Sequence, residues 1–165
     1  MHPRQEKEVR FFVDAMLGNI AKKLRVLGYD SKYFSDIDDE QLINEARKEN
    51  RTIISKDGEL VKKAEKLGMK PVFITKNDEI DQFLEIIYQT KLYISQIDGN
   101  SARCPKCNSI TESIRKATVK EKVPVKVYET NDYFWKCKNC SKVYWEGTHI
   151  KNLQKFVSEI NERLQ

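Results

Sequence analysis

The four cysteines of this chain form two identical pairs, each with two residues between its members. The pairs are Cys104-Pro-Lys-Cys107 and Cys137-Lys-Asn-Cys140. Each pair can place two thiolates on one metal ion, and two pairs complete a tetrahedral shell. A shell of four cysteines has no open position, so it supports structure and does not catalyse. The spacing therefore predicts one structural zinc ion in a small ribbon, with the chemistry elsewhere in the chain.

Two disulfides, four free buried thiols and a redox CxxC site are the alternatives to zinc. Residues 1–8 are polar and charged, without the apolar stretch of a secretory signal. We therefore expect a cytoplasmic protein, in which thiols stay reduced. Reduced thiols favour zinc over disulfides, and a redox site would require both pairs to work together.

The length of 165 residues suits one full domain with a small appended one. No apolar run approaches the ~18 residues of a membrane span, so no membrane association is expected. Residues 101–165 contain 13 Lys and Arg against 7 Asp and Glu, whereas residues 1–100 contain 17 against 18. The half with the cysteines is thus the basic half, which fits a polyanion-binding surface or an ordinary solvated face.

The first hundred residues alternate between strand and helix patterns. Short apolar or β-branched runs occur at residues 9–13, 31–34, 52–55 and 71–75, and apolar stripes at helical spacing follow them. Repeated strand–helix units predict an α/β domain with a central parallel sheet and helices on its faces. We place this domain at residues 9–98.

Residues 98–101, with the sequence Asp-Gly-Asn-Ser, are the expected linker to a zinc ribbon at residues 101–150. Short β segments are expected within the ribbon, including residues 123–128 and 133–135. Apolar residues near period 3.6 then predict a terminal helix at residues 151–165 that packs on the body.

Three aspartates follow the predicted strands of the first domain. Asp14 follows the first strand, Asp39 begins the helix after the second, and Asp57 comes two residues after the third. In a parallel α/β sheet all three lie at the carboxyl edge of the strands, where ligands bind. Crowded carboxylates repel one another, and a bound Mg²⁺ or Mn²⁺ ion removes that cost. Asp38 and Glu59 are candidates for further oxygen ligands.

Helix capping is the alternative explanation for these aspartates. Each of the three precedes a helix, where Asp is a favoured N-cap residue. Asp38 with Gln41 also resembles a capping box. Spacing alone leaves both explanations open.

The ordered motifs of the chain resemble those of the mutator-seven C-terminal ribonuclease domain family. The matching segments are residues 10–18, 24–30, 38–42, 53–57, 103–107 and 144–149. The resemblance implies a PIN-like fold, which is a three-layer α/β/α sandwich, with an appended zinc ribbon. It also implies a metal-dependent ribonuclease with acidic site residues at Asp14, Asp39 and Asp57. Where the family usually has Thr-Arg, this chain has Ser55-Lys56, which keeps the charge but loses bidentate phosphate contact.

We therefore expect an enzyme that hydrolyses RNA phosphodiester bonds with a carboxylate-held divalent metal, while the basic ribbon grips the RNA. The residues expected to contact RNA are Lys23, Arg25, Lys56, Lys136, Lys138 and Lys142. Aromatic residues among the ribbon lysines could stack on unpaired bases, which favours single-stranded RNA, or could form the ribbon core. The alternative function is a non-catalytic RNA-binding adaptor with a degenerate nuclease site.

Overall fold

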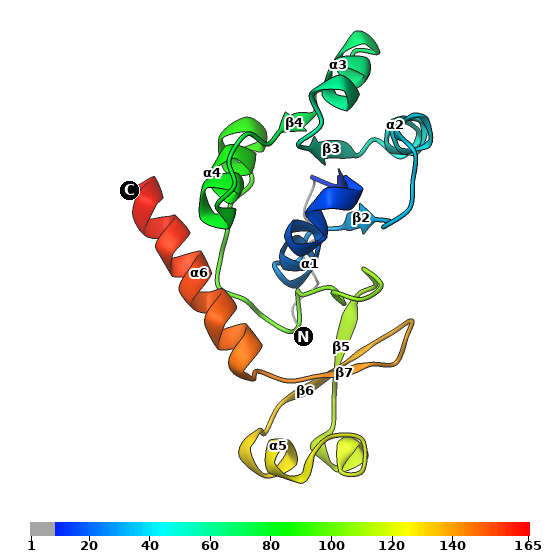
Figure 1. Cartoon of the computed structure of the whole chain (residues 1–165). Coiled ribbons are helices and arrows are strands. Elements are labelled where there is room, and N and C mark those ends of the chain that lie inside the picture. Colours follow the sequence, from blue (N-terminus) through cyan, green and yellow to red (C-terminus); the bar gives the residue numbers. More distant parts are fainter. Residues whose placement is uncertain (1–8) are drawn as a thin grey trace.

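The structure is a computed structural model that describes residues 9–165, and the segment 1–8 lies outside the described residues. Strands and helices alternate through the first part of the chain (Figure 1). Its elements are β1 (Phe11–Val13), the 3-10 helix η1 (Ala15–Leu17), α1 (Gly18–Val26), β2 (Ser31–Tyr33), α2 (Asp39–Lys48), β3 (Thr52–Ser55), α3 (Gly58–Lys66), β4 (Val72–Phe73) and α4 (Glu79–Thr90). The four strands lie in the order β2-β1-β3-β4, and neighbouring strands are parallel. The predicted α/β architecture is confirmed.

Two apolar cores cover the two faces of this sheet. Side chains alternate along β1, so Phe11 and Val13 enter the larger core and Phe12 enters the smaller one. The larger core packs the sheet against α1 and α4, and the smaller core packs it against α2 and α3. Because helices cover both faces, the body has three layers (Figure 1).

A second, antiparallel sheet lies in the cysteine-containing segment. The elements of this segment and of the chain end are β5 (Thr111–Ile114), the 3-10 helix η2 (Lys116–Val119), α5 (Val125–Thr130), β6 (Phe134–Cys137), β7 (Val143–Tyr144) and α6 (Thr148–Leu164). The strand order is β5-β6-β7. We call residues 101–147 the ribbon. Within residues 9–165, no helix is both long and apolar enough to cross a membrane.

The expectation of a β segment at residues 123–128 is wrong, because most of this segment forms α5. Alternating valines at positions 123, 125 and 127 imitate the period of a strand. Pro124 is the N-cap residue of α5, with φ −58°, and proline favours the start of a helix. Val127 and Tyr128 of this helix pack on the small apolar core of the ribbon.

The terminal helix α6 belongs to the larger core of the body, although it is remote from it in sequence. Its residues Leu153, Val157 and Ile160 are buried in that core with Phe83 of α4. Phe156 meets Phe83 edge-on, with 5.2 Å between the ring centroids. Figure 1 shows α6 running from the ribbon to the side of α4. The body therefore takes part of its core from the end of the chain.

The expected linker at residues 98–101 is a packed turn. The Asp98 carboxylate accepts the backbone N–H of Asn100 at 2.9 Å. A Cβ on Gly99 would lie 2.1 Å from the Trp135 ring. The Thr111 hydroxyl donates to the Gly99 carbonyl at 2.8 Å. These contacts fix the ribbon at the point where it leaves the body.

Candidate functional site

Asp14 and Asp57 are joined through the hydroxyl of Ser55 at the carboxyl edge of β1 and β3. Ser55 Oγ donates to Asp14 Oδ2 at 2.7 Å and accepts the backbone N–H of Asp57 at 2.9 Å. The backbone N–H of Asp14 donates to the Ile54 carbonyl at 2.9 Å, which extends the β1–β3 pairing to the edge. Ser55 is fully buried, so its hydroxyl is held in place.

Asp39 lies in the electrostatic field of this pair. Burial raises the pKa of Asp39, the carboxylates of Asp57 and Asp14 raise it further, and Lys63 opposes them. The three carboxylates do not all lie within 4.8 Å of one another, since the four cysteines are the one such group of potential ligands in residues 9–165. The carboxyl edge thus brings three carboxylates into mutual electrostatic interaction without a closed cluster of ligand atoms.

Asp14 and Asp57 also cap the helices that follow them. Asp14 Oδ1 accepts the backbone N–H of Ala15 at 2.7 Å, and Asp57 Oδ1 accepts that of Glu59 at 2.9 Å. Each carboxylate oxygen has more than one acceptor position, so a capping bond leaves room for a metal. Capping and metal binding are therefore compatible at these two residues.

The N-cap residue of α2 is Asp38, and Asp39 is its first helical residue. Asp38 Oδ1 accepts the backbone N–H of Gln41 at 2.8 Å, which is half of a capping box. The side chain of Gln41 donates to Glu45 instead. The cap of α2 is thus made without the Asp39 carboxylate. This carboxylate interacts electrostatically with Asp57 and Asp14.

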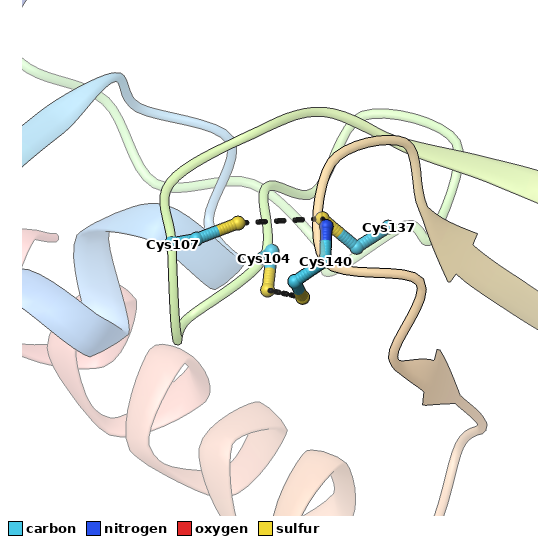
Figure 2. A group of neighbouring side chains, drawn as sticks. All are labelled: Cys104, Cys107, Cys137 and Cys140. Carbon is cyan, nitrogen blue, oxygen red and sulfur yellow. Dashed lines mark hydrogen bonds between the residues drawn. The ribbon is translucent and has the colours of Figure 1, made fainter.

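The four cysteine sulfurs meet in the ribbon, all within 4.8 Å of one another. Figure 2 shows the side chains pointing toward one another from two facing loops. Cys104 Sγ lies 3.8 Å from Cys140 Sγ, and Cys107 Sγ lies 3.4 Å from Cys137 Sγ. All four are free thiols, since these separations far exceed the ~2.05 Å of a disulfide. The cluster can hold a zinc ion.

Polar groups surround the sulfurs. The Tyr144 hydroxyl lies 2.9 Å from Cys104 Sγ, and the backbone N–H of Cys140 donates to Cys137 Sγ at 3.4 Å. Although burial raises the pKa of Cys107, hydrogen bonds with Ser109, Asn139 and Cys137 outweigh it and lower the pKa, whereas burial raises the pKa of its neighbour Cys137. A thiolate is the form that binds metal, so the lowered pKa of Cys107 and the N–H groups around the sulfurs favour a ligand role.

The first cysteine loop is anchored to the amino edge of the parallel sheet. Arg25 is 6% exposed and donates to the carbonyls of Ser31 and Pro105, each at 2.8 Å. Asp30, which precedes β2, accepts the side-chain amide of Asn108 at 2.7 Å. The acidic site lies at the carboxyl edge, so the cysteine cluster and the carboxylates occupy opposite edges of one sheet.

The Mut7-C RNAse domain model matches residues 9–157, which include both the acidic edge and the cysteine cluster. The chain belongs to this family. Comparisons with curated proteins and with solved structures return no significant match. Membership in the Mut7-C family points to a nuclease and to RNA as its substrate.

Two basic residues expected to contact RNA are engaged inside this Mut7-C domain. Arg25 is buried and hydrogen-bonded to the ribbon loop, which removes it from the set of RNA contacts. Lys23 pairs with Glu79 at 2.6 Å and lies 5.4 Å from the ring centroid of Phe156. At the acidic edge, Lys56 donates to the side chain of Asn77 at 2.8 Å.

The ribbon lysines lie near one acidic residue and one ring. Lys138 is 3.8 Å from Glu112, and Lys136 is paired with Glu112 across the β5–β6 ladder. Lys142 lies 5.4 Å from the ring centroid of Tyr144. Glu112 therefore offsets part of the positive charge on this face.

The ribbon aromatics serve mainly as core. Phe134 and Trp135 are buried, and the rings of Tyr128, Tyr144 and Trp145 are half-buried. Tyr133 is 74% exposed. One tyrosine, and not the whole aromatic set, is thus free to stack on a base from the ribbon.

Sequence reasoning missed a cavity of about 560 Å³ between the ribbon and α6. Its lining includes Trp135, Tyr144, Trp145 and His149. The residues that line the cavity are far apart in the sequence, so no local sequence pattern predicts it. Sequence reasoning also missed the bridging role of Ser55, for which a hydroxyl residue two positions before Asp57 was the available signal.

Proposed function

We propose that this Mut7-C domain is a metal-dependent ribonuclease that hydrolyses RNA phosphodiester bonds at the acidic edge. The Ser55 bridge between Asp14 and Asp57, with Asp39 in the field of both, carries the proposal. A divalent cation would relieve the repulsion that helps to raise the pKa of Asp39. A Mg²⁺ or Mn²⁺ ion supplies an activated water and charge stabilisation at such a site. Asp38 and Glu59 would add outer oxygen ligands from the first turns of α2 and α3.

The cysteine cluster is proposed to hold one structural zinc ion per chain, as suits a reducing compartment such as the cytoplasm. Four free thiols with nearby hydrogen-bond donors support this assignment. Zinc would fix the loops that Arg25 and Asp30 dock on the amino edge. Metal analysis should give one zinc per chain, and a chelator should unfold the ribbon first. A metal-free protein with an intact ribbon would contradict the assignment.

The RNA is proposed to contact Lys56 at the acidic edge and the ribbon through Lys136, Lys138 and Lys142. The net charge of +5 on residues 101–147, from 10 Lys and Arg against 5 Asp and Glu, supports this ribbon grip. Because the two regions lie at opposite edges of the sheet, one RNA strand must cross the body to reach both. A flexible single strand can follow that path, whereas a stiff duplex is less suited to it.

The decisive experiment replaces Asp14 or Asp57 with Asn. Asn caps helices about as well as Asp, so the helix starts are retained while the negative charge is lost. Cleavage of RNA with Mg²⁺ or Mn²⁺ should fall by more than ~100-fold, since loss of even an outer partner of a metal ligand costs up to that much. Asp78→Asn is the matched control, because Asp78 caps α4 in the same way.

Three outcomes separate the possible functions. Cleavage that is lost in Asp14→Asn and Asp57→Asn but kept in Asp78→Asn supports the acidic site. Unchanged cleavage in both site variants rejects it. A wild-type protein that binds RNA but never cleaves it with any divalent metal is the non-catalytic adaptor.

A further inference from the structure

Two phenylalanines share one transverse row of the sheet with the acidic site. At the end of β1, Val13 is paired with Tyr33 of β2 and with Ile54 of β3. One residue further along each strand, the next row across the sheet contains in order Phe34, Asp14, Ser55 and Phe73. An aromatic residue thus follows or ends each outer strand, with the acidic site between them.

Two contacts support this row. Ser55 donates to Asp14 at 2.7 Å, as neighbours in a row should. The Phe34 ring lies 6.0 Å from the ring of Phe12, which shares a face with Asp14 because it is two residues earlier in the strand. The aromatic residues and the carboxylate therefore belong to one side of the sheet edge.

Large apolar side chains are exposed around this row. Phe34 is 47% exposed and Phe73 is 39% exposed, and Met16, two residues after Asp14, is 76% exposed. A single exposed apolar side chain is ordinary on a protein surface. Here two exposed rings flank the carboxylates in one row, and solvent-exposed aromatic rings beside a charged site can stack on bases.

We propose that Phe34 and Phe73 are stacking platforms for two unpaired bases of the RNA, one on each side of the phosphate that faces Asp14 and Asp57. This inference rests on the proposed ribonuclease function and names its substrate class as single-stranded RNA. Stacking on a phenyl ring accepts any base, so the platforms hold the strand without reading its sequence.

The row also sets the distance between the two proposed platforms. Three strand spacings of ~4.8 Å separate β2 from β4, so about 14 Å lies between the two platforms. Lys56, adjacent to Ser55 in the sequence, brings positive charge to the same edge for the intervening phosphate. The bases of a duplex already stack on their neighbours, so a phenyl ring can reach only bases that are splayed out.

The test measures binding of a fluorescent single-stranded RNA and of the same RNA annealed to its complement. Measurement without added Mg²⁺ or Mn²⁺, and without a chelator that would strip zinc from the ribbon, excludes metal-dependent cleavage. The variants are Phe34→Ala, Phe73→Ala and the double variant. Phe34→Leu and Phe73→Leu keep apolar packing, including the contact of residue 34 with Phe12, but have no ring to stack. Tyr88→Ala is the control, because Tyr88 is 71% exposed on α4, outside the row.

Each ring loss should weaken single-strand binding by about 5- to 150-fold, and Leu should be as defective as Ala. The affinity of these variants for duplex RNA should equal that of the wild type. The Tyr88→Ala variant should bind both RNAs with wild-type affinity. The stacking proposal is rejected if the Leu variants bind single-stranded RNA with wild-type affinity. It is also rejected if the variants lose as much affinity for duplex RNA, or if the wild type does not bind single-stranded RNA. Ring-dependent binding by a wild type that does not cleave with Mn²⁺ would reject the ribonuclease and keep the platforms.

Discussion

Ser55 donates a 2.7 Å hydrogen bond to Asp14 from a fully buried position at the end of β3. Ser55→Ala removes this donor and the acceptor of the Asp57 N–H. We expect a loss of about 1–3 kcal/mol in the free energy of unfolding, as for other unsatisfied buried groups. Metal-dependent cleavage should fall as well, because the Asp14 carboxylate is no longer oriented.

Ser55→Thr is the matched control, since it keeps the hydroxyl. Thermal melts and single-turnover cleavage would measure both effects. If Ser55→Ala cleaved RNA at the wild-type rate, the bridge would have no part in the reaction.

Asp39 should make the metal-free protein less stable near neutral pH. Its pKa is raised in the folded state by burial and then by Asp57 and Asp14, so folding favours its protonated form. That favourable contribution is full below the unfolded pKa and is lost as the pH rises through the folded pKa. Asp39→Asn should therefore raise Tm near neutral pH without added Mg²⁺ or Mn²⁺ and have little effect below about pH 3.

Glu40→Gln is the control for Asp39→Asn, because both residues lie in the first turn of α2 and favour its dipole equally. Added Mn²⁺ should stabilise the wild type more than Asp39→Asn if this carboxylate is a ligand. Equal stabilisation of the two proteins by Mn²⁺ would exclude Asp39 from the metal site.

Gly99 should tolerate no side chain. A Cβ at this position would lie 2.1 Å from the ring of Trp135, which is itself buried. Gly99→Ala should lower the free energy of unfolding by about 1–3 kcal/mol, the usual cost of overpacking. Gly58→Ala is the comparison, because its Cβ would meet Phe73 at an ordinary 3.8 Å. Urea unfolding of the two variants measures this difference in the free energy of unfolding, provided that both have the same dependence of that free energy on urea concentration.

Replacing Lys136, Lys138 and Lys142 together with Ala should weaken RNA binding and flatten its salt dependence. Each lost phosphate contact lowers the slope of log K against log salt by about 0.7 for a single strand. Cleavage at saturating RNA should persist, since the ribbon lies at the sheet edge opposite the carboxylates. The same measurement on Lys151→Ala, an exposed residue of α6, is the control. An unchanged salt slope in the triple variant would show that the ribbon does not grip RNA.

The local pattern of the sequence predicted the parallel sheet, because apolar runs and helical stripes are properties of neighbouring residues. It also predicted the cysteine cluster, since a CxxC spacing fixes which sulfurs can meet. Residues 123–128 were misjudged because three alternating valines resemble a strand, while Pro124 starts a helix. The burial of Arg25 could not be foreseen, because its partner Pro105 is 80 residues away in the sequence.

The position of α6 bears on how the protein is made. Leu153, Val157 and Ile160 fill the core that β1 and α1 begin to build more than a hundred residues earlier and that α4 extends. Chains emerge from the ribosome with the N-terminus first, so the body spends most of its synthesis with this apolar face uncovered. A chain that stops before α6 would carry the complete acidic edge on an unfinished core. Completion of this core therefore depends on synthesis of the chain through α6.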